Sequence, residues 1–107
     1  MLKIDTHAHI LPMDWPDLAE KFAEPRFPVI HHHDGQHRIY RDGKFFREIW
    51  PTTWDPQLRS QEFAQHGVDV QVISTVPVMF SYWAKPLQAL ELHRYLNEHP
   101  AELCKAY

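Results

Sequence analysis

Two histidines separated by a single residue, near the start of the chain, carry the clearest chemical signal in the sequence. His7 and His9 lie within a short apolar-rich run from Leu2 to Ile10. If this run is a strand, its side chains alternate between two faces, and both imidazoles project from the same face. Two imidazoles so placed can reach one cation at about 2.0 to 2.1 Å, the usual Zn–N distance. The spacing therefore predicts half of a metal site, with His7 and His9 as ligands.

The same alternation makes a prediction about the neighbours of the two histidines. Asp5 is expected to share their face as a hydrogen-bonding partner, while Ile4, Ala8 and Ile10 share the other face and pack against helices. A His-x-His pattern also occurs by chance on surface strands. A buried strand, however, cannot carry such groups without partners, because each unsatisfied polar group costs about 1 to 3 kcal/mol. A bound cation would supply the partner.

Other elements must hold this strand in place. Leu11-Pro12 ends it, and a short helix is expected over residues 14–23 with Asp14 as its N-cap. Val68 to Ser74 is a nearly continuous run of Val and Ile, which is typical of a parallel strand covered on both faces. We expect this run to be the second core strand.

Two longer helices are predicted from their end signals. One begins with Asp55 as cap and Pro56 in the first position, ends before Gly67, and turns Leu58 and Phe63 inward. The other runs from about Ala84 to Glu98 and stops before Pro100, with one apolar stripe. The stripe consists of Ala89, Leu92, Tyr95 and Leu96.

Residues 25–51 have a different character and predict a small antiparallel sheet inserted after the first strand. Asp42-Gly43 stands between two short β-prone runs, and this dipeptide favours a hairpin turn with positive φ at both positions. The consecutive residues His31, His32 and His33, followed by His37, suggest a second metal site. Since consecutive residues of an extended chain point to opposite faces, we interpret them instead as part of a solvated loop before Gly35.

Composition excludes several classes of function. The chain has 107 residues, a formal net charge of −3 and a sequence pI near 6.3. This charge offers no basic surface to nucleic acid or to an anionic membrane. The single cysteine, Cys104, cannot form an internal disulfide, and the sequence carries no signal-peptide pattern and no apolar run of about 20 residues. We expect a cytoplasmic protein.

The segment from Ile4 to Pro12 resembles the first strand of the amidohydrolase superfamily, whose members are metal-dependent (β/α)₈ barrels. Three further stretches, residues 42–47, 54–56 and 74–86, are similar to decarboxylases of that superfamily that act in tryptophan degradation through the kynurenine pathway. The resemblance implies an α/β fold in which residues 1–107 form the N-terminal part of a TIM barrel, with the small antiparallel β insertion at about 25–51. Such a barrel needs about 250 residues, so we expect this chain to be incomplete and inactive by itself.

The resemblance also implies a site and a reaction. His7 and His9 match the first two Zn²⁺ ligands, and Arg47 matches an arginine that holds a carboxylate of a small-molecule substrate. The implied reaction is a zinc-dependent, non-oxidative decarboxylation by a homodimer. The remaining ligands and the acid/base residue would come from later strands, so no complete catalytic set is expected here. Taken alone, Arg47 is also an ordinary charge at a solvated strand end.

Other interpretations stay open. The apolar residues Phe46, Met79, Phe80 and Trp83 face the same pocket or belong to the core. The complete protein is a decarboxylase of this kind, or another metal-dependent hydrolase or aromatic-acid decarboxylase with the same first strand. The third alternative is a small non-catalytic metal-binding module that folds alone.

Overall fold

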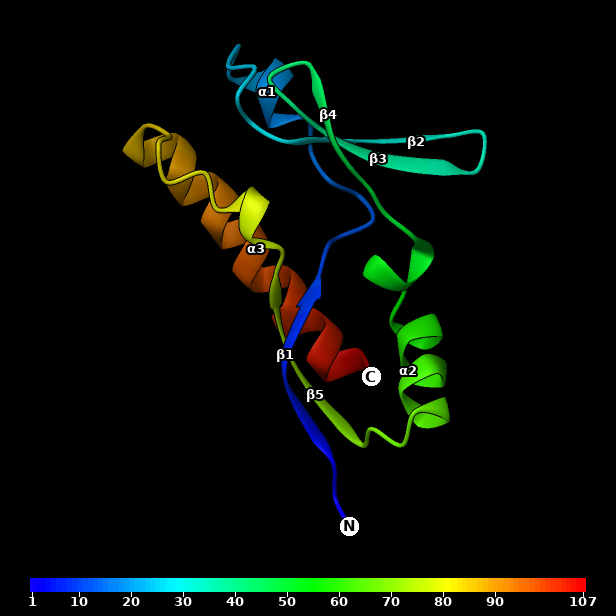
Figure 1. The fold of residues 1–107 in the computed structure, drawn as a ribbon. Coiled ribbons are helices and arrows are strands. Elements are labelled where there is room, and N and C mark those ends of the chain that lie inside the picture. The colour runs from blue at the N-terminus through cyan, green and yellow to red at the C-terminus, as the bar shows by residue number, and fades with distance from the viewer.

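Two separate sheets organise the chain in the computed structural model, which describes residues 1–107. Strands β1 (Ile4–Ile10) and β5 (Val70–Thr75) form a parallel pair. Strands β2 (Val29–His33), β3 (Gln36–Arg41) and β4 (Lys44–Glu48) form an antiparallel sheet in the order β2-β3-β4. Figure 1 shows the parallel pair in the lower half of the molecule and the antiparallel sheet at the top. The fold is therefore α/β, and it is compatible with part of a barrel.

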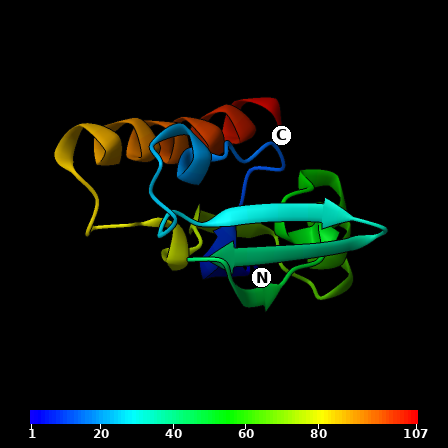
Figure 2. The ribbon, with the colours of Figure 1, turned by 90° about the horizontal axis from the view of Figure 1, so that it is seen from above.

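Three α-helices and two 3₁₀ turns connect these strands. The helices are α1 (Leu18–Lys21), α2 (Pro56–Gln65) and α3 (Pro86–Ala106). The turns are η1 (Pro51–Thr53) and η2 (Pro77–Met79). Seen from above, the β2–β3 hairpin projects as an arm, and α3 lies along another side of the molecule (Figure 2). None of these helices combines the length and apolar character that a bilayer crossing requires.

The parallel pair contains a register shift that decides where its side chains point. Asp5 pairs with Gln71, whereas His9 pairs with Ser74, so β1 uses one residue more than β5 between these positions. Such a bulge interrupts the alternation of faces. Paired residues of parallel neighbours share a face, and Gln71 and Ser74 lie on opposite faces because they are three residues apart. Asp5 therefore lies on the face opposite to His9, and the prediction that they share a face is wrong.

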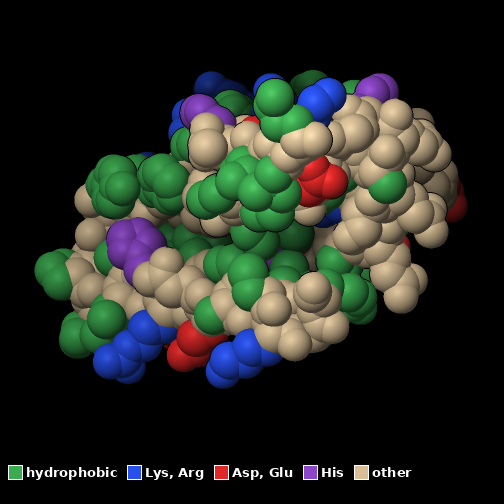
Figure 3. Space-filling model, turned by 90° about the horizontal axis from the view of Figure 1, so that it is seen from below, with side chains coloured by type: hydrophobic (Ala, Val, Ile, Leu, Met, Phe, Trp, Pro, Cys, Tyr) green, Lys and Arg blue, Asp and Glu red, His purple; other side chains and the backbone are tan.

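The same shift corrects the position of Ile4. Ile4 pairs with Val70, on the face of β5 that also carries Val72 and Ser74, rather than with the buried Ala8. The side chains of Ile4, Val70 and Val72 are 50%, 43% and 54% exposed. Helices α2 and α3 meet the other face, which carries Ile73. The prediction that β5 is covered on both faces is therefore wrong for these residues, and Figure 3 shows hydrophobic side chains gathered on the surface seen from below.

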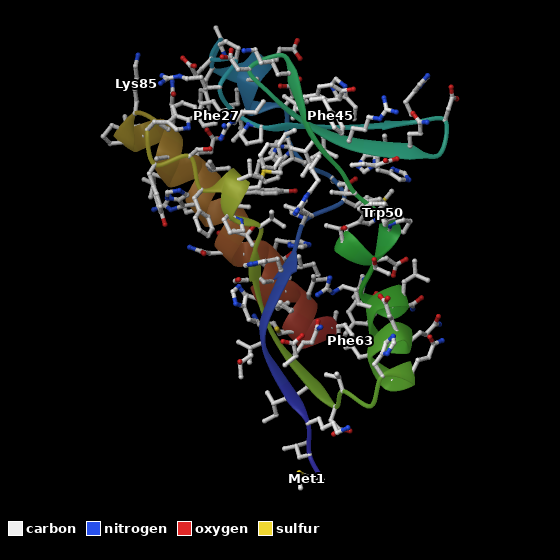
Figure 4. The ribbon with its side chains drawn as sticks, viewed as in Figure 1. Met1, Phe27, Phe45, Trp50, Phe63 and Lys85 are labelled. Atoms are coloured by element: carbon white, nitrogen blue, oxygen red, sulfur yellow. The ribbon has the colours of Figure 1, made fainter.

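The hydrophobic core lies between the antiparallel sheet, η2 and α3. Its fully buried members include Phe27, Ile39, Met79 and Leu92. Figure 4 shows Phe27 at the top of the molecule, between the antiparallel sheet and the start of α3. The chain that leaves β1 at Leu11 enters this same cluster. The core thus holds the carboxyl end of β1 against the inserted sheet.

Two Asp-Gly turns shape the inserted sheet. Asp42 and Gly43 have φ values of 55° and 70°, which confirms the predicted hairpin turn. Asp34 and Gly35 have φ values of 49° and 71°, so a second turn of the same sign joins β2 to β3. Because of this second turn, His31, His32 and His33 belong to β2 and not to a loop, and that part of the prediction is wrong.

The helix boundaries confirm some predictions and correct others. The Asp55 carboxylate accepts hydrogen bonds from the backbone N–H groups of Gln57 and Leu58 at 2.9 and 3.3 Å, as the N-cap prediction requires. Leu58 itself is 39% exposed, so its inward position is wrong, whereas Phe63 projects from α2 toward the strands (Figure 4).

The other two helices differ from prediction because of prolines. Helix α1 is short and capped by Asp17 rather than Asp14, since Pro16 disfavours helical geometry at the residue before it. Helix α3 continues through Pro100, where the missing N–H removes one hydrogen bond without ending the helix.

Replacing Leu92 by Ala should destabilise the fold by about 2 to 5 kcal/mol, because the side chain is fully buried and its removal leaves a cavity. Leu87, on the same helix, is 81% exposed and is the matched control. Urea unfolding should show a change within about 0.5 kcal/mol for Leu87→Ala. Equal effects of the two substitutions would contradict the assignment of the core.

Candidate metal centre and adjoining cavity

The two histidines of β1 face each other through their Nε2 atoms. These atoms are 3.1 Å apart, and the ring planes are nearly perpendicular at 88°. Tetrahedral zinc with Zn–N distances of about 2.0 to 2.1 Å places two ligand nitrogens roughly 3.3 Å apart. His7 and His9 therefore need almost no rearrangement to hold one ion. His7 is exposed and His9 is half-buried, so the pair is open to solvent and to further ligands.

Ser74 orients the second of these rings. The Nδ1 atom of His9 lies 3.1 Å from the Oγ atom of Ser74, which is its register partner on β5. If Nδ1 donates to this hydroxyl, the lone pair of Nε2 stays free for a cation. The sequence reasoning missed this role of Ser74. This contact depends on how β1 pairs with β5, and no local sequence pattern specifies that pairing.

Asp5 does not reach the imidazoles. One oxygen of its carboxylate accepts a hydrogen bond from the backbone N–H of His7 at 3.1 Å, and the other accepts from the Gln71 side chain at 3.2 Å. The prediction that Asp5 is a hydrogen-bonding partner of the two imidazoles is therefore wrong. Asp5 instead stabilises the bulge and joins β1 to β5.

No third ligand completes the site within residues 1–107. The structure holds no group of three or more His, Cys, Asp or Glu side chains arranged to bind a metal. The donor set of two facing imidazoles nevertheless fits zinc, which binds nitrogen ligands in tetrahedral sites. The pair thus has the geometry of a partial metal centre.

A cavity of about 550 Å³ adjoins the metal centre and contains Arg47. It is lined by His9, Ile39, Arg47, Glu48, Ile49, Trp50, Thr52, Thr53, Arg59 and Val76. The hydrogen bond from the Leu11 N–H to the Thr53 carbonyl, at 2.9 Å, ties the end of β1 to this wall. Trp50, labelled in Figure 4, stands where the chain leaves the inserted sheet. The structure therefore brings His9 and Arg47, which are 38 positions apart in the sequence, to one cavity.

Arg47 is the free cation of this cavity. It lies on β4, opposite Ile39 in the register, and forms no ion pair with any carboxylate of the chain. A guanidinium without a partner can pair with a ligand carboxylate through two parallel hydrogen bonds. Its position suits the recognition of an anionic group beside the metal centre.

Arg59 is a second cation of the cavity, and the sequence reasoning missed it. Its guanidinium donates to the Thr52 carbonyl and to the Gln71 side chain, both at 2.8 Å. Burial lowers the pKa of Arg59, and the charges of Glu62 and Asp5 partly oppose this shift. Through these two contacts Arg59 links η1 to β5 and holds the cavity wall in place. Both acceptors are neutral, so they do not cancel the positive charge that Arg59 adds to the cavity. An arginine in a predicted helix is usually a solvent-exposed surface residue, so the sequence alone does not indicate this role.

The aromatic and apolar residues considered for the pocket separate into two groups. Met79 is fully buried in the core, and neither it nor Phe80 lines the cavity beside His9. Phe46 and Trp83 line a different cavity, which also contains Arg26 and Lys44. The interpretation as core is confirmed for Met79, and none of the four residues lines the cavity beside His9.

Comparison with known proteins gives a consistent result. No family model matches the chain. The chain is 52% identical over 103 residues to a protein of Dictyostelium discoideum named 2-amino-3-carboxymuconate-6-semialdehyde decarboxylase. The aligned region covers 95% of this chain and 29% of that protein. A protein of Caenorhabditis elegans with the same name is 42% identical over 106 residues, or 98% of this chain and 26% of that protein. A protein of the same name from Sus scrofa is 43% identical over 49 residues.

The chain thus spans less than a third of the length of the first two relatives.

Replacing Ser74 by Ala should weaken zinc binding about tenfold or more, because His9 loses the partner that fixes its orientation. A competition titration with a zinc chelator on the complete gene product measures this change. The matched control is Ser60→Ala on α2, where the hydroxyl bonds only the Pro56 carbonyl. Unchanged affinity for Ser74→Ala would show that Ser74 does not support the metal ligand.

Proposed function

This chain is related along nearly its whole length to part of the 2-amino-3-carboxymuconate-6-semialdehyde decarboxylases, and we propose that the complete protein has this activity. The proposed reaction is the non-oxidative loss of carbon dioxide from 2-amino-3-carboxymuconate 6-semialdehyde in tryptophan degradation. The observation that carries the proposal is that His9, whose ring meets that of His7, lines one cavity together with the unpaired Arg47. A cation site beside a free guanidinium suits a carboxylate substrate.

His7 and His9 are the residues of this chain that would hold the zinc ion through their Nε2 atoms. When bound, zinc acts as a Lewis acid that polarises oxygen atoms in the site. Ser74 holds the ring of His9 through its Nδ1 atom, and the two rings meet through their Nε2 atoms. We assign the remaining ligands to residues beyond Tyr107.

Arg47 would bind and orient the substrate. Its guanidinium pairs with a substrate carboxylate, and its fixed place on β4 sets where that carboxylate lies relative to His9. Arg59 adds a second positive charge to the wall, which suits a substrate that carries more than one negative charge. The chain thus supplies anion recognition from the inserted sheet and α2, and metal ligation from β1.

The chemical step needs more than this chain provides. When the bond to the leaving carboxylate breaks, its electron pair stays on the carbon of the substrate, and a proton must then be delivered to that carbon. We assign this acid/base function to residues outside 1–107, on the further strands of a (β/α)₈ barrel. Isolated residues 1–107 should therefore show no turnover.

The activity is tested by supplying the semialdehyde to the complete gene product and measuring carbon dioxide release. His7→Ala and His9→Ala should each abolish release and lower the zinc content, because either change removes a ligand. Failure to consume the semialdehyde, together with turnover of an amide or of an aromatic acid, would favour another metal-dependent hydrolase or decarboxylase.

Replacing Arg47 by Ala should raise the KM for the semialdehyde by about 10- to 100-fold, since a hydrogen bond between charged groups contributes about 1.5 to 3 kcal/mol. Arg47→Lys should recover only part of this loss, because an ammonium group cannot form the paired contact. Arg41→Ala is the control, as Arg41 lies on the same inserted sheet but does not line the cavity. A normal KM for Arg47→Ala would exclude this role.

A further inference from the structure

A second pair of imidazoles lies on the β2–β3 hairpin, away from His7 and His9. His32 stands opposite His37 in the antiparallel register. Their Nδ1 atoms are 2.7 Å apart, and the ring centroids are 4.9 Å apart. The two side chains thus meet nitrogen to nitrogen across the hairpin.

Trp54 closes one side of this pair. Its ring centroid lies 5.0 Å from that of His32 and 4.7 Å from that of His37, in edge-to-face contact with both. Trp54 is only 9% exposed and belongs to the core, so it is a fixed base under the two rings. His32 is exposed and His37 is half-buried, which leaves the pair accessible to an ion from solvent.

The short contact between the nitrogens shows what the pair can bind. Only one proton can lie between two nitrogens at this distance, so at least one Nδ1 already offers its lone pair. If the donor ring takes its other tautomer, both lone pairs are directed at the same space. A tetrahedral ion requires nitrogens roughly 3.3 Å apart, so the rings need to separate by roughly half an ångström. Side chains at the accessible end of a hairpin can make that adjustment.

The charges on β2 and β3 do not oppose a cation, whereas Arg47 of β4 lies on the same face as the pair, opposite Ile39. On β2 and β3 the nearest arginine is Arg38, which pairs with His31 on the other face of the hairpin because strand neighbours alternate. The face of His32 and His37 continues inward to the apolar Ile30 and Ile39.

We propose that His32 and His37 bind a second divalent transition-metal ion, such as Zn²⁺ or Cu²⁺, with water in the remaining positions. Imidazole is a preferred ligand of both ions. With two protein ligands, this site binds its ion more weakly than a complete centre built around His7 and His9. The proposal does not depend on the proposed decarboxylase activity.

The position of this second site connects it to the cavity wall. Trp54 directly follows Thr52 and Thr53, which line the cavity beside His9. The carbonyl of His37 accepts a hydrogen bond from the Ile49 N–H at 2.8 Å, and Ile49 also lines that cavity. An ion held by His32 and His37 therefore joins β2 to β3 directly above Trp54 and restrains the wall that carries Arg47.

The experiment is a Cu²⁺ titration of the His9→Ala variant of the complete gene product, followed by tryptophan fluorescence, with Zn²⁺ equilibrium dialysis in parallel. We expect saturable quenching, because Cu²⁺ bound at the pair lies next to Trp54. His32→Ala or His37→Ala should weaken binding about tenfold or more. The milder His32→Gln substitution, which keeps a polar side chain, should have the same effect.

The matched controls are His31→Ala and His33→Ala, which remove exposed histidines from the same strand but from its other face. Both should bind Cu²⁺ as tightly as the parent. Trp54→Phe should lose the quenching and keep the Zn²⁺ stoichiometry. Quenching that survives His32→Gln, or dialysis that detects no saturable Zn²⁺ in the parent, would overturn the proposal.

Discussion

The bulge in β1 is the constraint on which the candidate site depends. Because β1 carries one residue more than β5 between its two paired stretches, Asp5 turns toward Gln71 and Arg59 while His7 and His9 stay together on the other face. A regular strand would have placed the carboxylate among the imidazoles, where it would compete for the same ion. The irregularity separates a structural polar group from the groups suited to metal binding.

Local chemistry explains which features could be predicted from the sequence. Asp55-Pro56 fixes the start of α2, Asp42-Gly43 fixes a hairpin, and the His-x-His spacing places two rings together, because each depends only on near neighbours. The resemblance to a decarboxylase is confirmed by the relatives. The bulge, the partner of His9 and the placement of Arg59 could not be predicted, since all three depend on how distant segments pair.

The inserted sheet and the parallel pair contribute different groups to the candidate site. The parallel strands present the imidazoles, whereas the sheet and the turn that follows it bring a guanidinium and most of the cavity lining. The core cluster that contains Phe27, Ile39 and Leu92 joins these two parts, and Ile39 also lines the cavity, so core packing sets the distance between His9 and Arg47. If Arg47 binds an anionic substrate as proposed, specificity depends on the packing of the insertion as much as on the charge itself.

A sheet of only two parallel strands has a further consequence for handling the molecule. Both outer sides of the β1–β5 ribbon carry backbone N–H and C=O groups without a strand partner, next to exposed Val70 and Val72. Unprotected margins of this kind recruit strands from other chains. Residues 1–107 prepared alone would therefore tend to aggregate. A soluble preparation would indicate that the free edges of β1 and β5 are covered.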